Sequence, residues 1–304
     1  MAKLLATEVA GLELKNPTML AAGILGISGA SLKRVAEAGA GAIVTKSVGL
    51  KPREGYSNPT VVPVECGLLN AIGLANPGIR GFDEEINEVR ASGIPLIVSV
   101  YGFSSNEFAT VSESAVKAGA DAVELNVSCP HVEKAGTEIG RDPQLVAEVV
   151  EEVKKRVEKP VFAKLTPNVA DITEIAKTAA DAGVDGITAI NTVKAMTINV
   201  ETARPVLSNR IGGLSGAAIR PIAVRCVYEI SREVDVPVIG CGGVLNWRDA
   251  VEFMLAGASA VQIGSAVAFR GLEVFRSITK GLSSYLEKRG LKSAGEIVGL
   301  SHRY

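Results

Sequence analysis

The run Glu124-Leu125-Asn126-Val127-Ser128-Cys129-Pro130-His131 brings together side chains that can do chemistry. A strand over 122–125 is predicted to end here in an amide, a hydroxyl, a thiol, a proline and an imidazole. A thiol acts as a base or a nucleophile where its surroundings favour the thiolate, although many cysteines are simply small buried packing residues. The run makes Cys129 a candidate for either role, and the rest of the sequence has to decide between them.

Polar residues also follow several other predicted strands. Lysine is rarely buried without a partner, so two lysines with amides between them favour an anionic heteroaromatic ligand over solvated rim residues. The residues just past the eight strands are Ala22-Gly23, Lys46-Ser47, Tyr101-Gly102, Asn126, Lys164, Asn191-Thr192, Gly242-Gly243 and Gly264-Ser265.

Glycines follow the last two predicted strands, in Gly242-Gly243 and Gly264-Ser265. Backbone N–H groups must approach phosphate oxygens closely, which side chains would prevent, and a following helix N-terminus adds its dipole. Each glycine motif alone is equally typical of a tight turn. Their joint position in the last two units favours a phosphate site, and hence a phosphate-bearing planar cofactor beside a flat polar substrate.

Two alternating signals divide the chain into units that place these residues. Ala-Gly motifs at 38–42, 118–122, 182–186 and 256–260 suit left-handed helix ends, and prolines at 95, 160 and 237 suit strand starts. Helices are predicted over 143–157, 171–182 and 218–233, among others. The predicted strands are Thr18–Ala21, Ile43–Val44, Leu96–Val100, Val123–Leu125, Val161–Ala163, Ile187–Ile190, Val238–Ile239 and Val261–Ile263.

This alternation predicts an α/β protein with the (β/α)8 TIM-barrel fold, as one domain over 1–304. Continuous apolar runs are typical of a parallel sheet covered by helices, and an open doubly wound sheet would want a G-x-G-x-x-G motif that the sequence lacks. Long βα insertions over 49–85 and 192–216 predict lids or substrate loops. Residues 4–14, with a turn at Gly11, predict an N-terminal hairpin that caps the barrel floor.

Composition and charge narrow the class of protein further. The chain has 32 basic and 33 acidic residues and no basic cluster, so we expect no nucleic-acid binding. Its four cysteines form no C-x-x-C pair, so we expect no zinc site, no iron–sulfur cluster and no other metal on this chain. Cys66, Cys226 and Cys241 are expected to be packing residues. No signal or membrane span is evident, which predicts a cytoplasmic protein without membrane association.

At these residues the sequence resembles the class 1 dihydroorotate dehydrogenases over nearly its whole length, and it is most similar to the NAD-linked type B catalytic subunit. The motifs with the highest specificity are Asn-Ala-Ile-Gly-Leu and Asn-x-Ser-Cys-Pro. The matching segments are 70–78, 126–130, 164–169, 190–192, 212–216, 240–244 and 255–265.

The resemblance implies oxidation of dihydroorotate to orotate in pyrimidine (UMP) biosynthesis, with FMN across the barrel mouth. Cys129 would remove the C5 proton while the C6 hydride passes to the flavin, and Lys164 would face the pyrimidine side of the flavin. Residues 129–141 would form a lid. The substrate would contact Lys46, Asn70, Ala71, Ile72, Gly73, Leu74, Asn126, His131, Asn191 and Thr192. FMN would contact Ala22, Gly23, Lys46, Ser47, Ser99, Asn126, Lys164, Ile190, Gly216, Gly242, Gly243, Gly264 and Ser265.

Three positions depart from the family pattern. Ala22 stands where serine is common, Ser99 where asparagine is usual, and His131 where relatives carry an asparagine that touches the pyrimidine ring. The first two remove or shorten a contact with FMN. The imidazole adds a titrating group near the expected base.

The resemblance also implies a partner. Because the chain has no cysteine cluster and no dinucleotide fingerprint, passing electrons to NAD requires a second subunit that carries FAD and an iron–sulfur centre, in a heterotetramer around a catalytic homodimer. Three alternatives stay open: a type A homodimer that reduces fumarate, a Schiff-base lyase in which Lys164 attacks a carbonyl, and a catalytically silent flavin-binding scaffold.

Overall fold

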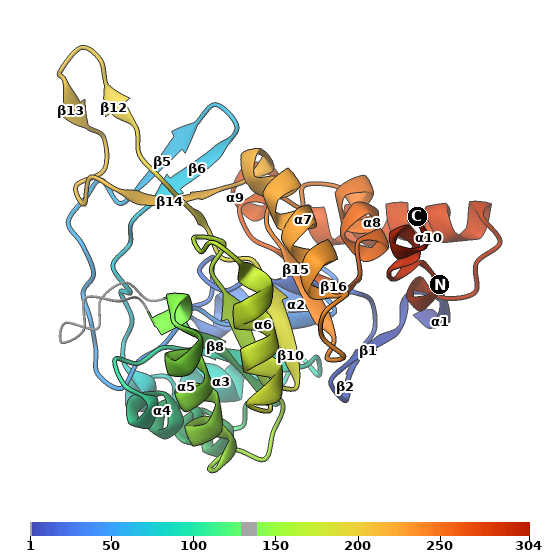
Figure 1. The fold of residues 1–304 in the computed structure, drawn as a ribbon, viewed down its shortest axis with the longest axis horizontal. Coiled ribbons are helices and arrows are strands. Elements are labelled where there is room, and N and C mark those ends of the chain that lie inside the picture. The colour runs from blue at the N-terminus through green and yellow to red at the C-terminus, as the bar shows by residue number, and fades with distance from the viewer. Residues whose placement is uncertain (1, 129–138) are drawn as a thin grey trace.

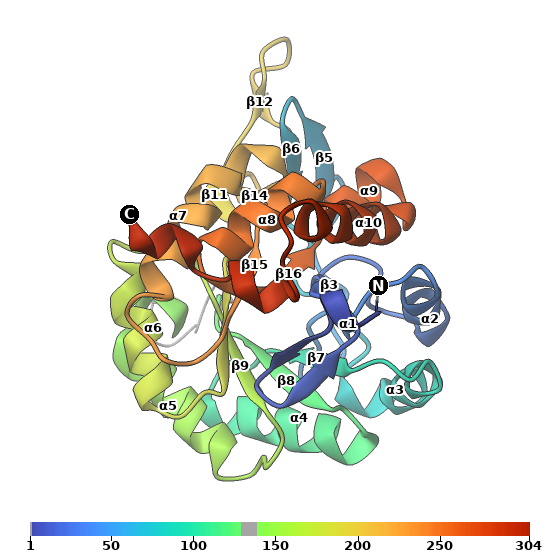
Figure 2. The same ribbon diagram turned by 90° about the vertical axis from the view of Figure 1, so that its right-hand side faces the viewer.

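The computed structural model describes residues 2–128 and 139–304 and has a closed barrel of eight parallel strands at its centre (Figures 1 and 2). The strands follow one another around the barrel in chain order, which confirms the predicted (β/α)8 fold. The last strand begins three residues before its predicted start. The barrel strands are β3 (Thr18–Leu20), β4 (Ala42–Val44), β7 (Leu96–Val100), β8 (Ala122–Asn126), β9 (Val161–Leu165), β10 (Gly186–Ala189), β15 (Val238–Cys241) and β16 (Ala258–Ile263).

Helices cover the outside of the barrel (Figure 2). Four of them are followed by a glycine in the left-handed region, at Gly39, Gly119, Gly183 and Gly257, as the Ala-Gly motifs predict. The α-helices are α1 (Ala2–Leu5), α2 (Gly29–Glu37), α3 (Asp83–Arg90), α4 (Ser105–Ala118), α5 (Pro143–Lys154), α6 (Ile172–Asp181), α7 (Arg220–Ile230), α8 (Trp247–Leu255), α9 (Ala266–Arg270) and α10 (Glu273–Lys288). Short 3-10 turns are η1 (Ile79–Gly81), η2 (Ile139–Arg141), η3 (Ala217–Ile219), η4 (Ala294–Ile297) and η5 (Leu300–Arg303).

The interior of the barrel is apolar at its amino end. Met19, Ile97 and Phe162 form one buried cluster there, and Val9 and Leu14 of the N-terminal hairpin belong to the same cluster. The hairpin consists of β1 (Thr7–Val9) and β2 (Leu12–Leu14), which pair antiparallel. It therefore closes the floor of the barrel, as expected, and leaves the carboxyl ends of the strands as the open mouth.

The two long insertions join in a single antiparallel sheet over the mouth. Its strands run in the order β11 (Val193–Ala195), β14 (Gly212–Ser215), β6 (Gly67–Asn70) and β5 (Val61–Val64). A smaller hairpin, β12 (Ile198–Asn199) with β13 (Arg204–Pro205), projects beyond this sheet (Figure 1). The sequence places the insertions in separate loops, whereas the fold uses both to build one roof.

No helix in the described part of the chain is long and apolar enough to cross a membrane.

Candidate functional site

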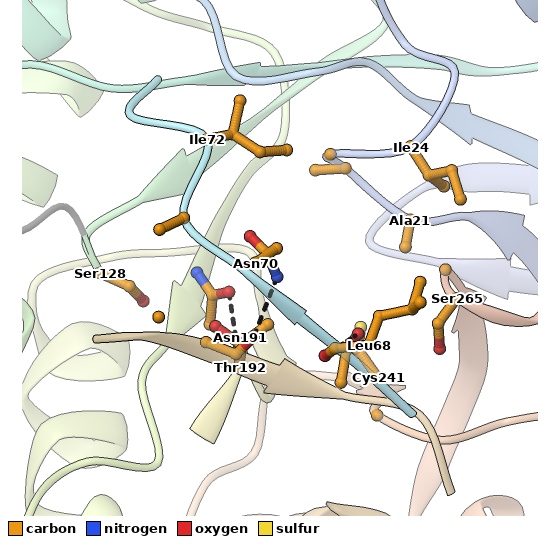
Figure 3. Close-up of a pocket in the computed structure, with 18 of the residues that line it drawn as sticks. Ala21, Ile24, Leu68, Asn70, Ile72, Ser128, Asn191, Thr192, Cys241 and Ser265 are labelled. Atoms are coloured by element: carbon orange, nitrogen blue, oxygen red, sulfur yellow. Dashed lines mark hydrogen bonds between the residues drawn. The ribbon is translucent and has the colours of Figure 1, made fainter. Parts of the chain in front are cut away.

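A cavity of about 810 Å³ lies between the barrel mouth and the roof sheet. Its walls come from both layers, because residues of the loops after the barrel strands face Leu68 and Asn70 on β6 (Figure 3). Ser265 and Cys241 lie toward one end of the close-up view and Ser128 toward the other. A cavity of this volume is at the upper end of the range for cofactor and small-ligand sites.

Most of the site residues expected from the sequence line this cavity. Ser99 does not: its side chain is fully buried, and its hydroxyl lies 2.9 Å from that of Ser47. Cys129 and His131 lie outside the described residues, as does the expected lid except for Ile139–Arg141. The expected residues that line the cavity are Ala22, Gly23, Lys46, Ser47, Asn70, Ala71, Ile72, Gly73, Leu74, Asn126, Lys164, Ile190, Asn191, Thr192, Gly216, Gly242, Gly243, Gly264 and Ser265.

Ser99 is thus a correction to its expected direct contact with FMN. An asparagine at this position has a longer side chain than serine. The shorter Ser99 side chain does not reach the cavity and instead contacts the Ser47 hydroxyl, which lines it. Ser99 supports Ser47, and Ser47 in turn accepts a hydrogen bond of 3.0 Å from the Asn126 amide. The hydroxyl pair therefore fixes the orientation of an amide that faces the cavity.

A second side-chain amide, Asn191, follows β10, which lies beyond β9 in the barrel. Asn191 donates to the Asn126 side-chain oxygen at 3.1 Å, and the Asn191 side-chain oxygen accepts from the backbone N–H of Thr192 at 2.8 Å. These side chains come from the carboxyl ends of β8 and β10, so the barrel brings together residues 65 positions apart in the sequence. The result is a pre-oriented strip of hydrogen-bonding groups that suits a flat polar ring.

A further amide, Asn168, was missed by the sequence interpretation. It lines the cavity and donates to the carbonyl of Thr192 at 3.1 Å and to the Thr166 hydroxyl at 2.9 Å. Its oxygen accepts from the backbone N–H of Lys194 at 2.8 Å, which ties the loop after β9 to the start of the roof. Its place in the matched segment 164–169 was the available signal.

Lys164 stands on the floor of the cavity and is almost fully buried, with 4% of its surface exposed. Its ammonium group donates to the Gln262 side-chain oxygen at 2.8 Å and lies 3.5 Å from a carboxylate oxygen of Glu124. Burial lowers the pKa of Lys164, but the negative charges of the Cys241 thiolate, which forms only at alkaline pH, and of the Glu124 carboxylate raise it by more, so the pKa lies above the ordinary lysine value. Lys164 is therefore a cation at neutral pH.

Lys46 differs from Lys164 although both lysines line the same cavity. No carboxylate in the described part of the chain forms an ion pair with Lys46. Partial burial lowers the pKa of its amine, since the charged form loses hydration without gaining a counter-ion. Lys46 is thus a cation available to an anionic group of a ligand.

The loops after β15 and β16 supply unpaired backbone donors at the cavity wall. The N–H groups of Gly242, Gly243, Gly264 and Ser265 donate to no acceptor in the described part of the chain. A Cβ added at Gly243, where φ is +80°, would lie 2.7 Å from the carbonyl oxygen of Gly216. A buried N–H group requires an acceptor, and phosphate oxygens at the carboxyl end of the last barrel strands would satisfy these donors.

The remaining cysteines fall into three environments. Cys226 is fully buried in the core, as expected. Cys66 is exposed, so the expectation of packing was wrong there, whereas Cys241 is half-buried and lines the cavity. Cys66 lies in the turn between two roof strands, and Cys241 occupies an inward position at the mouth. Burial raises the pKa of the Cys241 thiol, which keeps it neutral. No group of three or more described His, Cys, Asp or Glu residues is arranged to hold a metal ion.

A closed (β/α)8 barrel with unpaired backbone N–H groups after its last two strands and polar side chains at its mouth is typical of enzymes that bind a phosphate-bearing ligand. A family model described as dihydroorotate dehydrogenase matches residues 4–286. The chain therefore belongs to the dihydroorotate dehydrogenase family.

Several similar proteins are named dihydroorotate dehydrogenase B (NAD(+)), catalytic subunit. The one from Methanosarcina acetivorans is 53% identical over 297 residues, which cover 97% of this chain and 95% of that protein. The one from Methanocella arvoryzae is 51% identical over 96% of each chain. The one from Pyrococcus furiosus is 50% identical over 97% of this chain and 98% of the relative.

Proposed function

We propose that this chain is the catalytic subunit of an NAD-linked dihydroorotate dehydrogenase and oxidises dihydroorotate to orotate. The observation that carries the proposal is one cavity that combines a buried cation, a strip of oriented amides and a set of unpaired backbone donors. Family membership and the shared name of the relatives support the same activity. The reaction belongs to pyrimidine synthesis.

FMN fits the groups that the cavity offers. The unpaired N–H groups after β15 and β16, together with Gly216, suit its phosphate, and the Lys164 cation suits the pyrimidine side of its ring. When bound, FMN would supply the hydride acceptor, and the negative charge of its reduced form would lie at that side. Lys164 stabilises this charge, since a cation is worth more in a buried site than in water.

The substrate is a flat ring with amides and one carboxylate. Lys46 has no ion pair among the described residues, so it is the cation we assign to the carboxylate. Asn126 and Asn191 are held by mutual hydrogen bonds and suit the ring amides, with Thr192 beside them. Residues 70–74 cover the other face from the roof.

Cys129 is the residue we propose as the base. It follows Ser128, which lines the cavity, and its side chain has an ordinary pKa of about 8.5, far closer to neutral than that of a serine hydroxyl. In the proposed reaction the C5 proton would pass to the Cys129 thiolate and the C6 hydride to the flavin, which would leave a carbon–carbon double bond in orotate. A positioned base of this kind contributes about 10²–10⁴ in rate. His131 is assigned to the substrate ring.

The electrons then leave through another protein. We propose a partner subunit with FAD and an iron–sulfur centre, in a heterotetramer of two catalytic and two electron-transfer chains in the cytoplasm. The words "catalytic subunit" and "NAD(+)" in the names of the relatives favour this type B arrangement over a fumarate-reducing type A homodimer.

Lys164 argues against the lyase alternative. A lysine that attacks a carbonyl must lose its proton, which requires a lowered pKa. The Glu124 carboxylate, 3.5 Å away, keeps the Lys164 amine protonated instead. The site therefore favours charge stabilisation by Lys164 over covalent catalysis.

An absorption spectrum of the purified chain tests the proposal. The protein should carry a flavin spectrum that bleaches on anaerobic addition of dihydroorotate. Cys129→Ser should retain FMN and bind orotate but bleach at least a hundredfold more slowly. A colourless protein, or one that forms a borohydride-trapped adduct at Lys164, would overturn the proposed function; full-rate bleaching of Cys129→Ser would overturn the assignment of the base.

A further inference from the structure

A polar network lies inside the barrel, one layer above the apolar floor. It consists of Glu124 on β8, Lys164 on β9, Thr188 on β10 and Gln262 on β16. Each of these residues has at most 4% of its surface exposed. Buried charges of this kind persist only where they are paired and hydrogen-bonded, so the contacts within the network decide its role.

The contacts fix the direction of each group. One carboxylate oxygen of Glu124 accepts from the Thr188 hydroxyl at 3.0 Å and from the Gln262 amide nitrogen at 2.5 Å. The Gln262 oxygen accepts from the Lys164 ammonium at 2.8 Å. Because an amide nitrogen only donates and an amide oxygen only accepts, Gln262 transmits one orientation from Glu124 to Lys164.

The second oxygen of Glu124 has no hydrogen bond among the described residues, but it lies 3.5 Å from the Lys164 nitrogen. An ammonium group has three hydrogens. One goes to Gln262, a second is directed at Glu124, and the third remains for the cavity that Lys164 lines. The titratable groups that face Lys164 are Glu124 on β8 and Cys241 on β15.

We propose that Glu124 is a positioning residue: its carboxylate, held by Thr188 and Gln262, keeps Lys164 charged and directed at the group bound in the cavity. The inference rests on the proposed function insofar as that group is FMN. Glu124 lies behind Lys164 and does not line the cavity, so it acts through the lysine alone.

Glu124→Gln tests this role because it removes the negative charge and keeps the side-chain volume. A buried ammonium without a counter-ion loses its proton easily. The measurement uses cofactor-free protein labelled with ¹⁵N-lysine, in which the Lys164 signal is identified by its loss in Lys164→Met. In Glu124→Gln the pKa of Lys164 should be lower than in the wild type, so that the amine loses its proton at a proton concentration at least tenfold higher. An unchanged titration would overturn the inference, whatever the protein binds.

The flavin-loaded protein gives a second measurement. The reduction potential of bound FMN in Glu124→Gln should be more negative than in the wild type. At a pH above the lowered pKa of Lys164 in this variant, the potential should approach that of Lys164→Met. Thr188→Val is the comparison, since it removes one hydrogen bond of the network but keeps both charges; it should lower thermal stability and move the potential much less than Glu124→Gln does. A merely structural network would lower stability in both variants without moving the potential.

The two measurements distinguish a failure of this inference from a failure of the proposed function. A more positive potential in Glu124→Gln would mean that Lys164 has kept its proton and would overturn the inference. A wild-type protein that binds no FMN would overturn the proposed function, and the ¹⁵N titration would still decide the role of Glu124. If Glu124→Gln does not fold, Glu124→Asp moves the carboxylate away from Lys164 and should shift the titration in the same direction by less; no shift would overturn the inference.

Discussion

At the scale of single residues, the two cavity lysines show how environment separates identical side chains. Lys164 is paired with Glu124 and Gln262, so its charge is fixed before any ligand arrives. Lys46 has no such pair among the described residues, and burial lowers the pKa of its amine. A bound anion would therefore stabilise the charged form of Lys46 more than that of Lys164, because it supplies the counter-ion that Lys46 lacks.

Binding of orotate should therefore depend on pH through Lys46. The cation exists below its pKa, so affinity is full at neutral pH and falls by up to tenfold per pH unit above that pKa. Because the pKa is lowered, the fall begins below the value of about 10.4 for an exposed lysine. Titration of the flavin spectrum with orotate from pH 7 to 10 measures this.

Lys46→Arg provides the control, since arginine stays charged throughout this range. Its alkaline fall should be smaller than that of the wild type, and identical profiles would contradict the assignment. Lys46→Met should weaken binding at pH 7 by at least about tenfold, because a hydrogen bond between charged groups contributes about 1.5–3 kcal/mol.

At the scale of elements, the loop after β15 is held in shape from behind. Asp249, on the first turn of α8, accepts from the backbone N–H groups of Leu245 and Asn246 at 2.8 and 3.0 Å. The same carboxylate pairs with Arg220 at the start of α7. The ion pair joins the turn after Gly216 to the loop of Gly242-Gly243, so these two segments of the cavity wall are fixed relative to each other.

Gly243→Ala should disturb this loop and weaken FMN binding at least tenfold. The added methyl group would lie 2.7 Å from the Gly216 carbonyl oxygen, at a φ of +80° that costs about 1–3 kcal/mol for other residues. Quenching of FMN fluorescence on binding measures the affinity.

Gly295→Ala is the comparison for Gly243→Ala. The nearest atom to its added Cβ is 3.7 Å away, and Gly295 lines no part of the cavity, so FMN affinity should stay within twofold of the wild type. Equal affinity in both variants would remove Gly243 from the phosphate site.

At the scale of the whole molecule, three layers have separate structural roles. The hairpin of β1 and β2 closes the floor, the barrel holds the polar network, and the roof sheet closes the mouth around the cavity. The cavity of about 810 Å³ lies between the barrel and the roof, and no group of three or more described His, Cys, Asp or Glu residues is arranged to hold a metal ion. The proposed transfer of electrons to NAD assigns the second redox centre to a partner subunit, in keeping with the words "catalytic subunit" in the names of the relatives.

The isolated chain should reduce NAD slowly but an artificial dye acceptor rapidly, when both are supplied with dihydroorotate. Under the proposed function, a small dye takes electrons at the cavity directly, whereas NAD takes them through the cofactors that we assign to the partner. Steady-state rates with each acceptor, before and after addition of an electron-transfer subunit, measure the difference. Rapid NAD reduction by this chain alone would disprove the need for a partner.

The sequence by itself determined the barrel, because its signals are local. Apolar runs, Ala-Gly helix ends and strand-initiating prolines each act within a few residues, and all eight strands were placed by them. It also identified Lys46, Asn126 and Lys164, since strand ends in a parallel barrel share one rim.

The tertiary structure decided what depends on distant partners. Glu124 meets Gln262 across 138 residues, Asn70 donates to Gly213 across 143, and Ser99 lies behind Ser47 instead of at the cavity. A single carboxylate within an apolar strand gives no sign of its counter-ion. Such pairings arise from register and barrel closure, which bring inward-facing side chains together only once the chain has folded.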